Sequence, residues 1–282
     1  MEQMTGTRGA DLTAEQIETF ERDGAVLVRG LLDAASLADL RAAFDELKAS
    51  AYDLSGYYGG PKREGTSLVR DDNWMHSAAM RRVVLESAIP AAAAAVMRSS
   101  TARIYEDLLI YKSPGADQPT PWHQDEPQWP LTGRQMSSAW LCLDPVTVET
   151  GALRFVAGTH RGPLHIPYVP EAQRAAVEAD MHHFTGGPIP PIDAEPDRYP
   201  IVSYDCTPGD VVLFHPRAIH GAFGSRRETA RRTFSIRYIG DDVRWQTRAS
   251  VFHNWLNEIS LKDGDPIEAE RFPLAWAADR SA

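Results

Sequence analysis

Apolar residues near the start of the chain recur at helical spacing. Thr13 and Gln16 fit a capping box, which predicts a helix that ends near Gly24. A second helix is expected after Asp33, because a single apolar stripe follows it. The positions of that stripe are Leu37, Leu40, Phe44 and Leu47. Residues 1–100 are therefore expected to form a helical N-terminal shoulder.

Beyond residue 100 the apolar period becomes strand-like. Short β-rich runs, bounded by proline, glycine and aspartate turns, are found at 104–112, 136–143, 153–157, 201–205, 211–215 and 233–239. Many short strands without alternating helices predict a sandwich or jelly-roll barrel. We expect one domain over 1–282, mainly β, with the N-terminal helices packed on a core at 101–245 and a C-terminal extension at 246–282.

Two segments have loop composition. In residues 52–77, glycines interrupt several aromatic residues, among them Trp74. These aromatics either pack under the loop or form a wall over an active-site mouth and contact substrate. Residues 162–200 hold eight prolines and a predicted helix around 171–180. Long loops in compact domains tend to be lids or binding loops, so this insert is expected to be one.

Composition limits the possible partners. The net charge of −10 argues against nucleic acid or an anionic membrane surface as a partner. No stretch approaches the ~18 apolar residues of a membrane span, and the opening residues lack an apolar signal core. Cys142 and Cys206 lie in strand-like runs and are expected to be buried thiols, as in a reducing cytoplasm. We therefore expect a cytoplasmic location.

Candidate chemistry centres on the run from Pro121 to Trp129. Residues two apart on an extended strand face the same side, so His123 and Asp125 can converge on one metal ion. A distant histidine would complete the two-histidine, one-carboxylate set of non-haem Fe(II) oxygenases. The alternative is a half-buried histidine hydrogen-bonded to a carboxylate.

Either His215 or His220 could be the third ligand. His215 ends an apolar run and is expected to pack in the core. His220 precedes Gly221, which lets the backbone approach a bound group closely, so His220 is favoured.

An arginine on the last predicted strand extends the hypothesis. Arg231 would be carried across the barrel toward the metal, and a buried guanidinium binds a carboxylate through two hydrogen bonds. 2-Oxoglutarate offers a ketoacid end for iron and a second carboxylate for this arginine. A surface ion pair is the alternative. Strand alternation puts Arg231 and Arg237 on one face and Arg232 on the other.

The chain resembles the phytanoyl-CoA dioxygenase-like (PhyH) family of Fe(II)/2-oxoglutarate oxygenases. The resemblance covers roughly 20–276 and rests on YKSPGADQPTPWHQDEPQWP, MSSAWLCLDPVTVETGALRFVAGTHRG, PGDVVLFHPRAIHG and RRTFSIRYIGDD. It implies a double-stranded β-helix (jelly-roll) core. It also implies a set of site residues: His123, Asp125 and His220 as iron ligands, Arg231 as partner of the distal carboxylate, Trp140 and Leu108 beside the cosubstrate, and Trp129 near substrate.

Two details refine this resemblance. Family members often carry Asn and Ser after the distal histidine, whereas residues 222–227 here are Ala-Phe-Gly-Ser-Arg-Arg, which bears on the choice between Arg231 and its neighbours. Halogenating relatives replace the carboxylate ligand with a small residue. Asp125 is present here, which points to hydroxylation or a related oxidation.

The sequence thus predicts an Fe(II)/2-oxoglutarate-dependent dioxygenase that uses O2 to hydroxylate or otherwise oxidise an unactivated C–H bond of a small organic substrate. Succinate and CO2 are the expected coproducts. We expect a monomer or homodimer without nucleic-acid or membrane partners. Two other classes stay open: a zinc-dependent hydrolase on the same ligands, since two histidines and an aspartate also suit zinc, and a non-catalytic jelly-roll binding protein.

Overall fold

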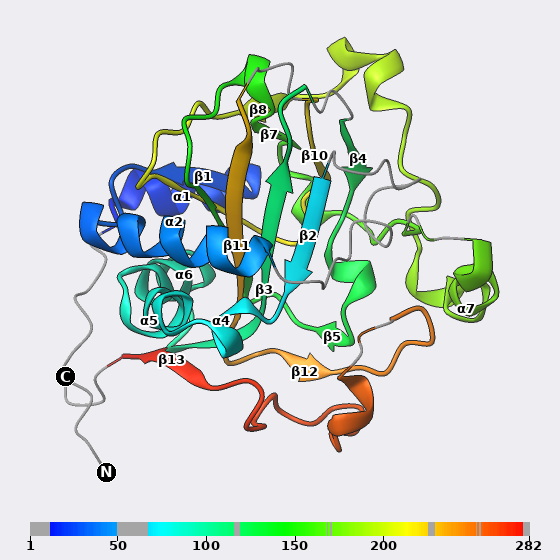
Figure 1. The fold of residues 1–282 in the computed structure, drawn as a ribbon. Helices are drawn as coiled ribbons and strands as arrows, with labels where there is room; N and C mark the ends of the chain where they lie inside the picture. Colours follow the sequence, from blue (N-terminus) through cyan, green and yellow to red (C-terminus); the bar gives the residue numbers. More distant parts are fainter. Residues whose placement is uncertain are drawn as a thin grey trace.

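The computed structural model describes residues 12–49, 67–115, 119–167, 169, 171–224, 229–251, 253 and 255–278. These residues form two packed antiparallel sheets, with helices on the outer face of the larger one (Figure 1). The helices are α1 (Ala14–Asp23), α2 (Ala34–Lys48), α4 (Asn73–His76), α5 (Ala78–Glu86), α6 (Ile89–Met97) and α7 (Arg174–Ala179). The strands that these helices accompany make a jelly-roll core, as expected.

The larger sheet has the strand order β1-β9-β6-β11-β3-β13, with β2 also paired to β3. Its strands are β1 (Ala25–Val28), β2 (Ser67–Asp71), β3 (Thr101–Lys112), β6 (Met136–Cys142), β9 (Val211–Phe214), β11 (Arg231–Ile239) and β13 (Leu274–Ala277). The smaller sheet has the order β4-β10-β7-β8, formed by β4 (Thr120–His123), β10 (His220–Ala222), β7 (Leu153–Val156) and β8 (Ile201–Ser203). A short ribbon pairs β5 (Leu131–Thr132) with β12 (Arg244–Trp245).

The first two helices begin where the sequence predicts, and α1 also ends there. The Thr13 hydroxyl accepts a hydrogen bond from the Gln16 amide, and the Gln16 side-chain oxygen accepts one from the Thr13 amide. Gly24 ends α1 at φ 80°, a left-handed conformation that costs glycine little. The whole predicted stripe of α2 is buried and packs against the larger sheet, which makes the helical shoulder part of the main core.

Alternation along β11 separates two environments. Phe234, Ile236 and Tyr238 face outward into the core shared with the helices and are fully buried. The intervening residues face the smaller sheet, together with their partners on β3 and β6. This inner face carries polar side chains deep inside the protein, at Glu106, Lys112, Ser138, Arg231, Thr233, Ser235 and Arg237.

Two predicted segments differ from expectation. Residues 67–77 were expected to be loop, but they contain β2 and α4, because β2 extends the larger sheet beside β3. The rest of that loop, up to residue 66, lies outside the described residues. The C-terminal extension was treated as an addition to the core, yet β13 pairs with β3 within the larger sheet.

The proline-rich insert at 162–200 contains a 3-10 turn (Glu171–Gln173) followed by α7, close to the predicted helix. It runs along the side of the molecule away from the N-terminal helices (Figure 1). Cys142 and Cys206 are free, buried thiols. Among the described residues, no helix is long and apolar enough to cross a membrane.

Candidate metal centre

Two histidine side chains meet where β4 and β10 pair. His123 lies directly opposite His220 in the register, and their ring centroids are 4.2 Å apart. The Nδ1 of His123 lies 2.8 Å from the Pro121 carbonyl oxygen, and the Nδ1 of His220 lies 3.0 Å from that of Ala218. A carbonyl can only accept, so each Nδ1 carries the proton. Both Nε2 lone pairs are therefore available to a metal ion.

Asp125 completes the group, but it does so from a turn and not from the strand that carries His123. The expectation that it continues the strand of His123 is wrong, because β4 ends at His123 and Asp125 has helical dihedrals (φ −79°, ψ −41°). Its Oδ1 lies 3.4 Å from the His123 Nε2 and 3.9 Å from the His220 Nε2. The three ligand atoms lie within 4.8 Å of one another, the one such group among the described residues.

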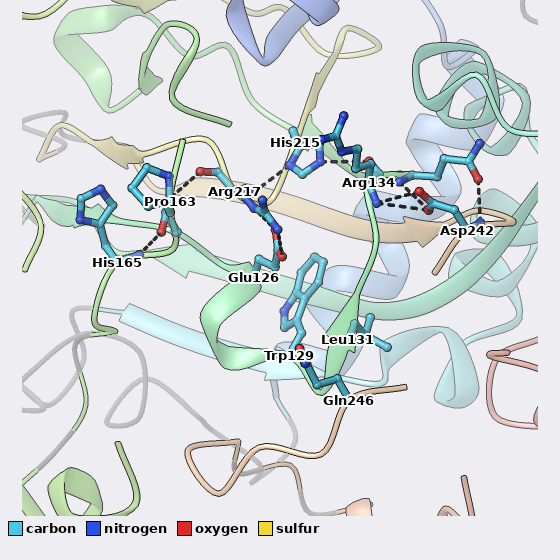
Figure 2. A network of polar contacts seen from close by, with 12 residues as sticks. Glu126, Trp129, Leu131, Arg134, Pro163, His165, His215, Arg217, Asp242 and Gln246 are labelled. Carbon is cyan, nitrogen blue, oxygen red and sulfur yellow. Dashed lines mark hydrogen bonds and ion pairs between the residues drawn. The ribbon is translucent and has the colours of Figure 1, made fainter. Parts of the chain in front are cut away.

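The turn that carries Asp125 is fixed by buried polar contacts (Figure 2). The Asp125 amide donates to the Pro216 carbonyl, at 2.8 Å, in the loop that leads to β10. The neighbouring Glu126 is fully buried and accepts a hydrogen bond of 2.8 Å from the Arg217 Nε in that same loop. Arg248 donates to the carbonyls of Glu126, Trp129 and Leu131. These contacts tie the turn to the loop before His220, so the ligands from distant segments keep one geometry.

Gln124, between two of the ligands, joins a third segment to the turn. Its side-chain nitrogen donates to the Arg217 carbonyl at 2.7 Å and to the Pro163 carbonyl at 3.1 Å. Its side-chain oxygen accepts from the His165 amide at 2.7 Å. The start of the 162–200 insert is therefore anchored to the ligand turn.

The electrostatics of the group favour a cation. Burial would raise the pKa of Asp125, but the Arg237 guanidinium and both histidines together hold it well below its usual range. Burial lowers the pKa of His123, but the hydrogen bond and charge of Asp125 outweigh this and raise it. Burial, with the neighbouring His123, lowers the pKa of His220 to about 4. Asp125 is thus a carboxylate and His220 is neutral, which are the forms that bind metals.

Two basic side chains are buried at the other end of the inner face. Arg231 is 4% exposed and donates to the Gly151 carbonyl, while its Nε has no hydrogen-bond partner among the described residues. Its register partner on β3 is Lys112, whose Nζ lies 3.4 Å from the Thr120 hydroxyl. Burial lowers the pKa of Arg231 to about 10, and burial together with Arg231 lowers that of Lys112 to about 7.

The other residues predicted to lie beside the cosubstrate are found between the two ends. Leu108 and Trp140 flank Ser235 in the register, on its two sides, and both are 3% exposed. Arg232 faces the other way and pairs with Asp144, at 2.9 Å. The alternative in which Arg231 makes a surface ion pair is wrong, since this side chain is buried on the inner face.

His215 lies outside the metal group, as expected of a core residue. Its Nε2 donates to the Arg134 carbonyl at 3.0 Å, and its Nδ1 accepts from the Arg217 amide at 3.0 Å. Both ring nitrogens are therefore occupied by backbone groups, and His215 supports the ligand turn rather than the ligand set (Figure 2).

The two tryptophans proposed as substrate contacts are buried. Trp129 is 2% exposed and packs 5.0 Å, centroid to centroid, from Tyr105. Trp74 is 5% exposed and packs in the main core. Substrate contact by either ring stays a prediction.

Sequence reasoning missed Lys112, Glu106 and the role of Arg237. Alternation placed Arg237 on the face of Arg231, which was the available signal. Its contacts with Asp125 and Glu106 depend on pairing between segments far apart in the chain.

Comparison with known proteins identifies a family and a shared fold. The family model for phytanoyl-CoA dioxygenase (PhyH) matches residues 20–233. A probable phytanoyl-CoA dioxygenase from Caenorhabditis elegans is 31% identical over 140 residues, which are 48% of this chain and 42% of that protein. The chain spans less than half the length of the curated relatives that it matches.

Two solved structures share the fold. The α-ketoglutarate-dependent carbocyclase SnoK from nogalamycin biosynthesis has a TM-score of 0.73 and 24% identity, covering 96% of this chain and 99% of SnoK. The epimerase SnoN, in complex with Fe3+, α-ketoglutarate and nogalamycin RO, has the same TM-score and identity, covering 93% and 98%. With the family model matching more than half of its length, the chain belongs to the phytanoyl-CoA dioxygenase (PhyH) family.

Proposed function

We propose that the protein is an Fe(II)/2-oxoglutarate-dependent dioxygenase that hydroxylates, or otherwise oxidises, an unactivated C–H bond of a small organic substrate, with release of succinate and CO2. The observation that carries the proposal is the pairing of two features in one interior. A two-histidine, one-carboxylate group lies at one end, and the buried basic residues Arg231 and Lys112 lie at the other.

The residues at the first end fit iron. His123, His220 and Asp125 present two nitrogen atoms and one oxygen atom, the donor set of facial non-haem Fe(II) sites, and both Nδ1 protons are held by carbonyls. Bound iron would supply the O2 chemistry that side chains cannot perform. The chain's own part is to hold the ligands, orient the cosubstrate and keep water out.

The residues at the second end fit the distal carboxylate of 2-oxoglutarate. On β10 the pairing partner of His220 is His123, whereas Ala222 pairs with Thr120, which Lys112 contacts. Two residues of a strand span about 7 Å, a length that suits a short dicarboxylate between the two ends. Arg231 can bind that carboxylate through two hydrogen bonds. Leu108 and Trp140 would line the path between them.

Substrate contacts and biological setting belong to the same proposal. Trp129 and Trp74 are proposed to contact substrate, and we expect the enzyme to act in the cytoplasm as a monomer or homodimer. The acyl-CoA substrate named in the family is not part of the proposal. The similar structures include a carbocyclase and an epimerase, so product analysis has to separate hydroxylation from other oxidations.

The two alternatives predict different sites. A zinc hydrolase needs a carboxylate as general base beside the metal and no dicarboxylate pocket. The two nearby glutamates are each paired with an arginine, Glu126 with Arg217 and Glu106 with Arg237, which favours the oxygenase. A non-catalytic binding protein would need no metal-binding group.

A substrate screen scored by succinate release tests the proposal. The protein is incubated with Fe(II), 2-oxoglutarate, O2 and candidate small molecules. We expect substrate-dependent succinate that disappears in His220→Ala and when zinc replaces iron. Turnover with zinc in the absence of 2-oxoglutarate would favour the hydrolase. Succinate that never rises above the His220→Ala level with any substrate would favour the binding protein.

A further inference from the structure

Arg237 stands in contact with the candidate ligand carboxylate. Its Nη2 lies 3.5 Å from the Oδ2 of Asp125. The other carboxylate oxygen, Oδ1, is the one that faces the Nε2 atoms of His123 and His220. Oδ1 of Asp125 therefore faces the candidate metal position, and Oδ2 faces the Arg237 guanidinium.

Arg237 is itself held from several sides. On β11 it lies opposite Glu106 of β3, and its Nε is 3.5 Å from the Glu106 Oε2. The guanidinium carbon lies 5.8 Å from the centre of the Trp129 ring. Arg237 and Glu106 are 5% and 1% exposed. A long cationic side chain packed in this way cannot swing freely, so the position of its Nη2 is set by the fold.

Glu106 is in turn backed by aromatic residues. Its Oε1 is 3.6 Å from the Nδ1 of His253, whose Nε2 lies 3.2 Å from the Tyr105 hydroxyl. The His253 ring stacks on Trp255, with centroids 4.6 Å apart. A continuous chain of buried contacts therefore runs from the aromatic cluster through Glu106 and Arg237 to Asp125.

We propose that Arg237 is a positioning residue that holds Asp125 as a one-oxygen metal ligand, and that Glu106 fixes Arg237 in that role. By binding Oδ2, Arg237 prevents the carboxylate from turning to offer both oxygens, and keeps Oδ1 aimed between the two histidines. The coordination positions that a second oxygen would take stay open. The proposal rests on the metal site of the proposed function, but on neither its cosubstrate nor its substrate.

Orientation and charge make opposite predictions for metal affinity. If Arg237 acted only as a nearby positive charge, its removal would tighten the binding of a divalent cation. If it acts by orienting Asp125, its removal weakens binding, because supporting contacts around metal ligands are worth roughly 10- to 100-fold in affinity. The sign of the change therefore decides between the two roles.

The experiment measures Co(II) binding to the metal-free protein by titration, with the visible spectrum as a second readout. We expect Arg237→Gln to raise the dissociation constant by about 10- to 100-fold. Arg237→Lys keeps the charge but loses the planar fork, so it should also weaken binding. Glu106→Gln should do so to a smaller degree. In Arg237→Gln the visible bands of bound Co(II) should also change, because Asp125 is no longer held in one orientation.

Two controls separate positioning from general damage. Arg232→Gln removes an arginine from the opposite face of the same strand and should leave the dissociation constant within twofold. In an Asp125→Ala background, Arg237→Gln should cause no further loss of metal affinity, because the interaction has already been removed. Thermal unfolding of each variant checks that it is folded. If Arg237→Gln does not fold, Arg237→Lys takes its place in the test.

Tighter or unchanged Co(II) binding in Arg237→Gln would overturn the proposal. The proposal would also be wrong if Arg237→Gln weakened Co(II) binding equally in the Asp125→Ala background, since Arg237 would then not act by orienting Asp125. No measurement here uses 2-oxoglutarate, substrate or O2. A protein that releases no succinate would contradict the proposed function and leave this test unaffected.

Discussion

Arg231 and Arg232 are consecutive residues of β11 whose guanidinium groups lie on opposite faces of the larger sheet. Arg231 is 4% exposed and donates to the Gly151 carbonyl on the inner face. Arg232 pairs with Asp144 at 2.9 Å and with Asp45 at 3.2 Å beside helix α2. The acids that pair with Arg232 are thus part of the protein, whereas Arg231 lies beside a second basic residue, Lys112, at the end of the inner face that we assign to a dicarboxylate.

Replacing these two arginines separately tests the cosubstrate pocket. Arg231→Gln should weaken 2-oxoglutarate binding by about 30- to 1000-fold, because a two-point contact between arginine and carboxylate in a buried pocket is worth roughly 2–4 kcal/mol. Fe(II) binding should be nearly unchanged. Arg232→Gln is the matched control and should alter the 2-oxoglutarate dissociation constant little. A loss found only in Arg232→Gln would contradict the assignment.

The identity of the third ligand is tested at two histidines. His123→Ala and His220→Ala should each abolish the weak visible charge-transfer band of the anaerobic complex with Fe(II) and 2-oxoglutarate, since each removes an Nε2 that faces Asp125. His215→Ala should keep the band, because both nitrogens of His215 bind backbone groups. The reverse pattern for His215 and His220 would show that the ligand set is wrong.

Much of the fold and of the candidate site could be predicted from the sequence, because several of the patterns that determine them lie within one segment. The Thr13 capping box, the apolar stripe of α2 and the alternation in β11 each depend on neighbours within one segment. The preference for His220 over His215 also used local signals: Gly221 follows His220, and an apolar run precedes His215.

What the sequence missed depends on pairing between distant segments. Asp125 reaches the histidines from a turn held by the Pro216 carbonyl, so strand alternation gave the right partner for the wrong reason. Strand β2 was missed because its glycine-rich approach is typical of a loop, and its pairing with β3 joins segments that are far apart in the chain. The Arg237–Asp125 contact needs the register of β11 on β3, which includes a shift after Arg237.

The carboxylate ligand also predicts how the enzyme treats halides. Asp125 takes a coordination position that a halide would otherwise need, so chloride or bromide should not enter the product. The measurement is mass spectrometry of the product formed from a true substrate in each salt. The Asp125→Gly variant frees that position and is the comparison. A halogenated product from the unmodified protein would overturn the expectation.

The 162–200 insert is predicted to cover the site and to become ordered when substrate binds. Limited proteolysis should cut it in the ligand-free protein and spare it with Fe(II), 2-oxoglutarate and substrate. Gln124→Ala should speed the cutting, because Gln124 bonds to Pro163 and His165 at the start of the insert. Gln135→Ala removes similar bonds to Arg98 and Asp242 and should not. Equal cutting with and without ligands would argue against a lid.

Stability should depend on pH through His215. Burial, with a smaller effect of the Arg217 charge, lowers its pKa from 6.5 to about 4. Between these two values the unfolded chain binds more protons than the folded protein, so the free energy of unfolding rises with pH in this window. The contribution of His215 to stability is complete above pH 6.5 and is lost as pH falls toward 4. A shift of this size corresponds to at most about 3 kcal/mol.

The difference between wild type and His215→Gln reports this contribution together with its coupling to His160, whose ring lies 5.7 Å away, because glutamine does not titrate. Denaturant unfolding with EDTA, to remove metal, should show the wild-type advantage shrinking by up to about 1.4 kcal/mol per pH unit below pH 6.5. If the stability difference between wild type and His215→Gln stays constant from pH 7 to pH 4, His215 takes up its proton in the folded protein as readily as in the unfolded chain. Its Nδ1 could then not accept the hydrogen bond from the Arg217 amide, and that contact would be wrong.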